Sequence, residues 1–346
     1  MRIVHVDNLR LHHYGREKFF TGRKLLHGLI RNNWRVCAFS DADVAYFEAP
    51  LHVREFGLRI ANRRLIETCD SFRPDLVILG FCDIIRNATL RAIRDLLPGV
   101  RIACWNVDSL WQERNIGRLR LRMDYADALF VTTGGETLRQ FCTARNVVAY
   151  MPNPTDPAVD DQDNSAKTAF DRDLVFCSGR PPEDPRYAFV GRLHETLRGQ
   201  LRFESFGLHG RPAVWGRAYE EVLAGSKMGL NLNHIEDWPL YSSDRIAQLM
   251  GNGLLTFLWD KGDMRRLFDD RHAVFFRDAD HLAAQVRAFH ADDARRRAVA
   301  AAGRAWYHEH YSAERVARFI AETTLGLPYS HAYTWAGEVY RSQSSR

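Results

Sequence analysis

Short apolar segments alternate with helical patterns along the first half of the chain, and this alternation restricts the possible folds more than any other feature. A strand, a helix and a second strand in this order form a parallel sheet with helices on its faces. Strands are expected at 2–6, 34–39, 75–81, 101–106, 128–132 and 147–151, and helices at 16–33, 55–72, 87–97 and about 135–145. These segments predict a doubly wound, Rossmann-like α/β domain over residues 1–152.

The second half repeats this alternation and predicts another Rossmann-like domain over residues 174–325. The expected strands are 174–177, 203–207, 228–233, 254–258 and 273–276, and the expected helices are about 185–200, 218–225, 243–251, 263–268, 279–290 and 293–325. Residues 326–346 are expected to form a C-terminal extension and tail.

A proline-rich segment separates the two halves. Met151–Pro157 contains three prolines and leads into the polar stretch 158–173. Proline interrupts both helices and sheets, so residues 153–173 are predicted to be an interdomain linker. Two such domains predict a ligand-binding cleft between the carboxyl ends of their strands.

Composition indicates a folded protein and argues against one class of partner. Of the 346 residues, 46% are hydrophobic and 26% are charged, which is ordinary for a folded chain. The net charge of +5 is too small and too dispersed to indicate binding to nucleic acid. The excess suits small anionic ligands. The arginine-rich stretch 114–122 fits either an anionic lipid surface or a solvated helix face.

Cysteine usage and hydropathy indicate the compartment. The six cysteines are scattered without close pairs, as expected of buried thiols in a reducing environment. No apolar run is long enough to cross a bilayer, and the first residues form a strand instead of a leader. The expected location is the cytoplasm, with peripheral contact to the inner face of the membrane left open.

Polar residues follow the strands of the first half. His12, His13 and Tyr14 lie in the loop after the first strand, and Asp83 and Asp108 follow two later strands. His13 and Asp108 are candidate catalytic groups, since imidazole and carboxylate can accept a proton near neutral pH. His12, Tyr14 and Asp83 are candidate acceptor-binding residues. Ordinary surface histidines and helix-capping aspartates are the alternative interpretation.

A second group of polar residues suits an anionic ligand. The stretch Tyr241–Phe257 opens a helix with hydroxyl groups and an arginine, and a helix N-terminus attracts phosphate. An ordinary capped helix is the alternative. Neither a phosphate-binding P-loop nor a dinucleotide-binding glycine fingerprint is present. The candidate donor-binding residues are Gly179, Arg180, Asn231, Asn233, Tyr241, Ser242, Ser243, Arg245 and Gln248, and Arg245 is also a candidate catalytic residue.

An ordered set of motifs resembles one family. The set spans about 226–320 and comprises Gly229–Leu232, Ser243–Gln248, Gly251–Gly253, Leu254–Phe257, Gly262–Phe268, Phe276–Leu282 and Ala302–Tyr311. It resembles the GT-B glycosyltransferases, and within them the group related to the spore-maturation glycosyltransferases. The N-terminal half resembles this class in architecture only.

The resemblance implies a function and a division of labour. The C-terminal domain would hold a nucleotide-sugar donor, and the N-terminal domain would hold an acceptor hydroxyl of a surface glycan or glycolipid. The nucleotide sugar is a co-substrate, and no further cofactor is expected. Arg245, Arg180 and the helix start at 243 would stabilise the leaving phosphate without a metal ion. Retention of configuration at the transferred sugar is implied by the resemblance alone.

One position departs from the family pattern. The glutamate that grips the donor ribose in related enzymes is Gln248 here. Glutamine still accepts and donates hydrogen bonds, but it carries no charge, so the nucleotide could differ and could be cytidine monophosphate. Two other functions stay open, namely a nucleotide-sugar epimerase or hydrolase of the same fold and a non-catalytic sugar-nucleotide-binding protein.

Overall fold

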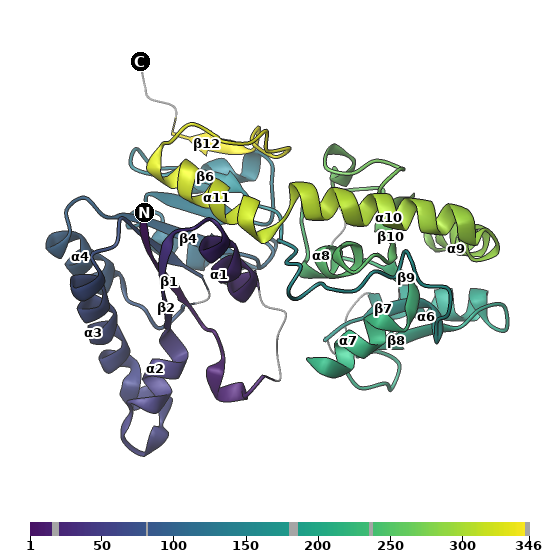
Figure 1. Cartoon of the computed structure of the whole chain (residues 1–346), viewed down its shortest axis with the longest axis horizontal. Coiled ribbons are helices and arrows are strands. Elements are labelled where there is room, and N and C mark those ends of the chain that lie inside the picture. Colours follow the sequence, from purple (N-terminus) through teal and green to yellow (C-terminus); the bar gives the residue numbers. More distant parts are fainter. Residues whose placement is uncertain (16–20, 81, 180–185, 235–237, 343–346) are drawn as a thin grey trace. The chain divides into compact units, whose positions relative to one another are not determined.

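The chain forms two compact units in a computed structural model (Figure 1). The structure describes residues 1–15, 21–80, 82–179, 186–234 and 238–342. Unit 1 comprises Met1–Pro154 and Ser312–Arg346, and unit 2 comprises Thr155–Tyr311.

Unit 1 contains a seven-stranded sheet in the order β12-β6-β5-β4-β3-β1-β2. The strands are β1 (Arg2–Asp7), β2 (Arg35–Ser40), β3 (Leu76–Leu79), β4 (Arg101–Asn106), β5 (Ala128–Val131), β6 (Val147–Tyr150) and β12 (Val339–Arg341). The first six pair in parallel, and β12 is antiparallel to β6. The side chains of β3 and β5 are buried along their whole length because helices cover both faces, which confirms the predicted doubly wound sheet.

The helices of unit 1 differ from the prediction at three places. They are α1 (Thr21–Arg31), α2 (Asp41–Phe47), α3 (Arg54–Phe72), α4 (Asn87–Leu96), α5 (Glu113–Arg122) and α11 (Ala313–Leu325), with short 3-10 helices η1 (Leu11–His13), η2 (Pro50–His52) and η3 (Glu136–Phe141). Helices α2 and α5 are not among the predicted helices. The helix expected at 135–145 is the shorter η3, because Asn146 turns the backbone by hydrogen bonding to Thr143 N and Phe141 O.

The helix expected at 293–325 is two helices that belong to different units. Helix α10 (Asp293–His310) ends before Tyr311, and Ser312 caps α11 by accepting a hydrogen bond from Arg315 N. Helix α11 lies beside α1 in unit 1 (Figure 1). Trp335, which is 1% exposed, packs on Phe319 of α11. The segment predicted as an extension, 326–346, is therefore part of the fold of unit 1 as far as residue 342.

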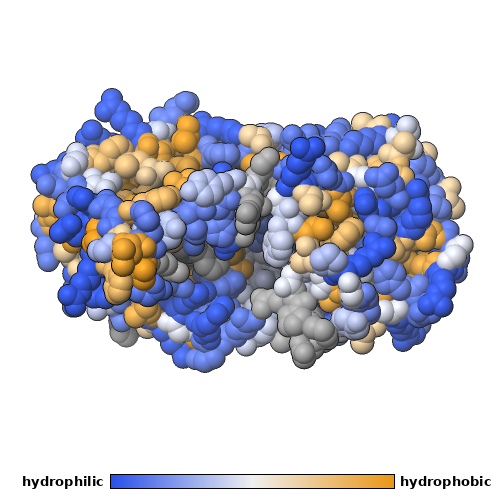
Figure 2. All heavy atoms as spheres, turned by 90° about the horizontal axis from the view of Figure 1, so that it is seen from below, coloured by the Kyte–Doolittle hydropathy of each residue, from blue (hydrophilic) through white to orange (hydrophobic). Residues whose placement is uncertain are grey.

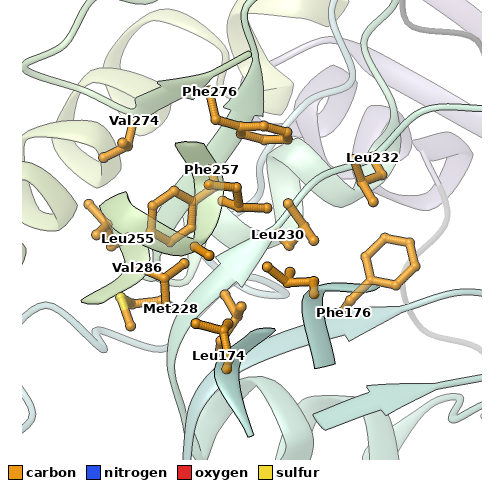
Figure 3. Close-up of a cluster of buried hydrophobic side chains, with 14 of the residues drawn as sticks. Leu174, Phe176, Met228, Leu230, Leu232, Leu255, Phe257, Val274, Phe276 and Val286 are labelled. Carbon is orange, nitrogen blue, oxygen red and sulfur yellow. The ribbon is translucent and has the colours of Figure 1, made fainter. Parts of the chain in front are cut away.

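Unit 2 contains a five-stranded parallel sheet in the order β11-β10-β9-β7-β8. The strands are β7 (Arg172–Cys177), β8 (Phe203–Phe206), β9 (Ser226–Leu230), β10 (Leu255–Trp259) and β11 (Val274–Phe276). The helices are α6 (Arg186–Leu197), α7 (Arg217–Ala224), α8 (Asp244–Gly251), α9 (Ala279–Ala291), α10 and the 3-10 helix η4 (Met264–Arg266). Alternate side chains of the central strands meet Val286 of α9 in one apolar core (Figure 3). This order of strands and helices confirms the second predicted α/β unit.

The stretch 155–171 belongs to unit 2, whereas the sequence predicted a linker over 153–173. Asn164 is fully buried, and its amide donates to the backbone oxygens of Leu223 and Ser226. Arg296 of α10 donates to the oxygen of Asn164. These bonds satisfy backbone groups that a polar, irregular segment would otherwise leave unpaired, so the stretch packs although its composition is that of a loop.

Candidate functional site

Arg245 lies at the carboxyl ends of β7 and β9. Its Nε donates to the oxygen of Cys177 at 3.0 Å, and its Nη1 donates to Asn231 Oδ1 at 3.1 Å and to the oxygen of Leu232 at 3.0 Å. The guanidinium carbon lies 4.9 Å from the centre of the Phe176 ring. Among the described residues these partners are all neutral, so the charge of Arg245 has no carboxylate beside it.

Arg186, at the start of α6, is a second cation at this edge that sequence reasoning missed. It is 6% exposed, donates to the oxygen of Leu232 at 3.2 Å and lies over the same Phe176 ring. Burial and the Arg186 charge lower the pKa of Arg245. Two guanidinium groups that share one carbonyl oxygen repel each other, so an anion bound between β7 and β9 would relieve the repulsion. Only the folded chain brings Arg186 to Leu232, and no sequence signal marks it.

The start of α8 also faces this edge. Ser243 is the N-cap residue, but its side chain does not cap the helix; it donates to Asn231 Oδ1 at 2.7 Å. Asn231 Oδ1 therefore joins Ser243 and Arg245, and all three residues are among the candidate donor-binding residues. An N-terminal turn that lacks a side-chain cap keeps backbone N–H groups for a ligand.

The other candidate donor residues have mixed placements. Ser242 is 2% exposed, whereas Asn233 and Tyr241 are half-buried. Arg180 lies outside the described residues. Gly179 follows β7, and a Cβ atom built there would lie 2.9 Å from the ring of Trp215. The space beside Gly179 is thus occupied by an indole of the same chain.

Gln248 is bound on both sides by its own chain. Its Oε1 accepts from the hydroxyl of Tyr219 at 2.7 Å, and its Nε2 donates to Asp244 Oδ2 at 2.7 Å. The side chain is 8% exposed. An ionised glutamate could not donate a hydrogen bond to Asp244, so the acid at position 244 requires an amide at position 248 near neutral pH. This pairing gives a structural reason for the departure from the family pattern.

Replacing Gln248 by glutamate should therefore destabilise the protein in a pH-dependent way. The new carboxyl would face Asp244, and like charges at this distance raise the pKa of one of them. Because the carboxyl pKa is higher in the folded state, the loss of stability is absent below the pKa of the unfolded chain, near pH 4. The loss of stability is complete above the pKa of the folded state. We expect a loss of about 1–3 kcal/mol at pH 8 and little loss near pH 4, measured by thermal or urea unfolding.

The double variant Asp244→Asn, Gln248→Glu is the control for this prediction. The asparagine amide can donate to the new carboxylate, so stability at pH 8 should recover. A single variant as stable as the parent at pH 8 would contradict the hydrogen bond between Gln248 and Asp244.

In unit 1, one arginine joins two of the predicted carboxylates. Arg118 of α5 donates to Asp83 at 2.5 Å and to Asp108 at 2.9 Å. A small cavity of about 70 Å³ lies beside them at the carboxyl ends of β3 and β4, lined in part by Trp105 and Asn106. The structure thus brings Asp83 and Asp108 together through Arg118, which the sequence did not single out for this role.

The histidine loop forms a separate group in unit 1. His12 Nδ1 lies 2.5 Å from Asp43 Oδ1, and His13 contacts the ring of His12. Burial raises the pKa of the Asp43 carboxyl, but hydrogen bonds from Ser40 and His12 outweigh burial and hold this pKa below its ordinary value. Tyr14 is 87% exposed. Asp43 therefore orients the His12 ring.

Asp7 is a buried carboxylate at the end of β1, which lies between β3 and the edge strand β2. It is 2% exposed, and Cβ atoms built at Gly22 and Gly80 would lie 1.4 Å and 2.8 Å from its carboxyl oxygens. His5, on the same face of β1, is fully buried 4.0 Å from Asp7, and burial lowers its pKa to about 4. Sequence reasoning chose the histidines of the following loop and missed Asp7, whose glycine surroundings come from distant segments.

Two absences concern the described residues only. They include no group of three or more His, Cys, Asp or Glu residues that could hold a metal ion. None of their helices combines the length and the apolar character needed to cross a bilayer.

The arginine-rich stretch 114–122 forms most of α5. Arg120 donates to Glu113 and Arg122 donates to Asn87, while Arg118 bridges the two aspartates Asp83 and Asp108. These contacts favour an ordinary helix face over a lipid-binding surface.

Two Rossmann-like α/β units in one chain are the architecture of the GT-B fold. Residues 186–322 match the family described as glycosyl transferase-like. The chain is a glycosyltransferase of the GT-B fold. No curated protein sequence is significantly similar to it. The predicted class is confirmed, and the spore-maturation group within that class stays a prediction.

Solved structures share the fold at low sequence identity. Sucrose-phosphate synthase from Thermosynechococcus elongatus matches with a TM-score of 0.55 and 13% identity over 93% of this chain and 98% of that one. AviGT4, a glycosyltransferase involved in avilamycin A biosynthesis, matches with a TM-score of 0.55 and 15% identity over 99% of this chain and 100% of that one. HepE from Anabaena, in complex with UDP and glucose, matches with a TM-score of 0.54 and 12% identity over 94% of this chain and 100% of that one.

Proposed function

We propose that the chain transfers a sugar from a nucleoside-diphosphate sugar to a hydroxyl of a surface glycan or glycolipid, with retention at the transferred carbon. The observation that carries the proposal is Arg245, a cation at the carboxyl edge of the sheet in unit 2 whose hydrogen-bond acceptors in the described part of the chain are all neutral. A diphosphate supplies the missing negative charge and several acceptor oxygens.

Leaving-group stabilisation would come from groups already in place. As the sugar departs, negative charge grows on the terminal phosphate, and fixed cations aimed at that charge lower the barrier. Arg245 and Arg186 supply two such cations, and the N-terminal turn of α8 supplies backbone N–H groups. We propose that these groups, instead of a divalent cation, neutralise the leaving phosphate.

The acceptor hydroxyl is proposed to bind in unit 1. Carboxylates and imidazole at the carboxyl ends of its strands can accept a hydrogen bond from a sugar hydroxyl. Candidates are the Asp83–Arg118–Asp108 bridge and the His12–Asp43 pair. His13 and Tyr14 of the same loop stay candidates for contacts with the acceptor.

Structures of similar fold support the choice of donor and the stereochemistry. HepE from Anabaena has been solved in complex with UDP-glucose. A trehalose-6-phosphate synthase of similar fold has been studied for glycosyl transfer with retention, and it matches with a TM-score of 0.53 and 13% identity. These likenesses favour a uridine nucleotide as the first donor to test.

Ligand-dependent thermal unfolding tests the proposal. A ligand that binds only the folded chain increases the free energy of unfolding, by about 2.7 kcal/mol at 100 times its Kd, and therefore raises Tm. We expect one nucleoside diphosphate among UDP, GDP and ADP to raise Tm by several degrees, equally with and without EDTA. Cytidine monophosphate tests the alternative donor class. No shift with any of these nucleotides would contradict the donor site, and a shift abolished by EDTA would contradict metal independence.

Turnover of the matching nucleotide sugar then separates the proposed reaction from hydrolysis or epimerisation. We expect release of the nucleoside diphosphate to be slow without an acceptor and to rise when a glycan or glycolipid acceptor is added. Fast release that no acceptor stimulates would favour the hydrolase instead.

A further inference from the structure

Trp215 lies in an unusual environment for its residue type. It is 62% exposed, and among the described residues of unit 2 no other large apolar side chain is exposed. Removing a large apolar side chain from water stabilises a folded protein. An isolated tryptophan left in solvent therefore needs a reason other than the stability of the fold.

The position of Trp215 is set by two glycines at the end of β7 and β8. A Cβ atom at Gly179 would lie 2.9 Å from the indole, so Gly179 leaves room for the ring. A Cβ atom at Gly207 would lie 1.7 Å from the oxygen of Ser178, and the N–H of Gly207 donates to Arg211 O and Pro212 O. The loop from β8 to α7 is thus held against the carboxyl end of β7, with Trp215 at its far end.

This position is next to the cationic edge of the sheet. Arg245 donates to the oxygen of Cys177, and Gly179 is two residues further along the chain. Two residues span at most about 7 Å, so Trp215, beside Gly179, lies at the same end of β7 as the oxygen that Arg245 binds. A nucleotide places its base at this kind of separation from its phosphates, with the ribose between them.

The residues around Trp215 do not form an apolar patch for a protein partner. The Arg211 and Arg217 side chains of the same loop and of α7 are 51% and 85% exposed and pair with Glu204 and Glu221. A single flat aromatic side chain among charged residues suits a small planar ligand better than a second protein surface.

We propose that the Trp215 indole is the platform on which the nucleobase of the donor stacks, and that Gly179 is a positioning residue that keeps the ring at this place. The inference rests on the proposed donor site. Stacking of a base on an aromatic side chain contributes about 1–3 kcal/mol and distinguishes poorly among bases. Trp215 therefore contributes affinity for the nucleoside, while Arg245 and Arg186 contribute affinity for the phosphates.

Calorimetric titration of the full chain with UDP and with inorganic pyrophosphate tests the proposal. For Trp215→Ala we expect UDP to bind about 10- to 100-fold more weakly and pyrophosphate to bind as to the parent. Trp215→Phe should lose less than about 10-fold because a smaller ring still stacks. Gly179→Ala should weaken UDP but not pyrophosphate, since its methyl group displaces the indole.

Phe56 provides a matched control in unit 1, where it is also 62% exposed. It lies in the first turn of α3, and Figure 2 shows that hydrophobic side chains also reach the surface of the protein on the face seen from below. Phe56→Ala should leave UDP affinity unchanged.

The outcomes separate this inference from the proposed function. Unchanged UDP affinity in Trp215→Ala overturns the platform, and the donor site survives if an Arg245 variant still weakens UDP. Equal weakening of UDP and pyrophosphate in Trp215→Ala also overturns it, since stacking acts on the base alone. A parent protein that binds pyrophosphate but no nucleotide overturns both.

Discussion

Replacing Arg245 by alanine should lower kcat/KM for the nucleotide sugar by at least about 100-fold. Loss of one fixed group that stabilises charge in a transition state typically costs 100- to 1000-fold. Arg245 is the cation whose described partners are all neutral, so a bound diphosphate would be its first anionic partner. Steady-state transfer kinetics and calorimetric binding of the nucleoside diphosphate check this expectation.

Arg245 also ties the ends of β7 and β9 to α8, so its removal should cost stability as well as activity. Hydrogen bonds to the oxygens of Cys177 and Leu232 are lost in the alanine variant. Unfolding curves are therefore needed beside the kinetics. Arg245→Lys keeps the charge but fewer donors and should be intermediate in activity.

Arg217 gives the matched control, because its side chain is 85% exposed and pairs with Glu221 on α7. Arg217→Ala should transfer sugar at the normal rate. Near-normal transfer by a folded Arg245→Ala variant would refute the assignment of the donor site.

Replacing Gly28 by alanine should destabilise the protein by about 3 kcal/mol. A Cβ atom at Gly28 would lie 2.0 Å from the oxygen of Ala313, so α1 and α11 would have to separate. The neighbouring atoms belong to the backbone, which yields less readily than a side chain, and overpacking of this kind costs 1–3 kcal/mol or more. Urea unfolding of the variant and the parent measures the difference.

Gly117 in α5 provides the opposite result as a control. Outside the backbone of its own helix, no atom lies within 4 Å of a Cβ built there. Gly117→Ala should therefore increase the free energy of unfolding by about 0.5–1 kcal/mol. If Gly28→Ala also stabilised the protein, the close contact between α1 and α11 would be wrong.

The sequence predicted most strands because their pattern is local. A strand buried on both faces, such as Leu76–Leu79, is a short apolar run, and the helix between two such runs has its own periodicity. Helix α2 escaped detection because it is short and begins directly after β2, with two acidic residues in its first turn. The strand β12 escaped because three residues carry too little pattern to recognise.

The candidate donor site was predicted in part for the same reason. Ser243, Arg245 and Asn231 belong to an ordered motif set, and the structure joins all three at Asn231 Oδ1. Arg186 and Trp215 were missed, since neither a buried arginine nor an exposed tryptophan can be recognised without the neighbours that the fold supplies. Gln248 was recognised as a departure, but its partner Tyr219 lies on another helix.

By itself the sequence determined that the chain has two α/β units and that α8 opens with hydroxyl groups and an arginine, because spacing and capping act over a few residues. The tertiary structure alone decided that α11 returns to unit 1, where Gly28 admits the backbone of Ala313. It alone placed Arg186 beside Arg245 and Trp215 over Gly179. These arrangements depend on contacts between residues far apart in the chain, and such contacts leave no periodic signal in the sequence.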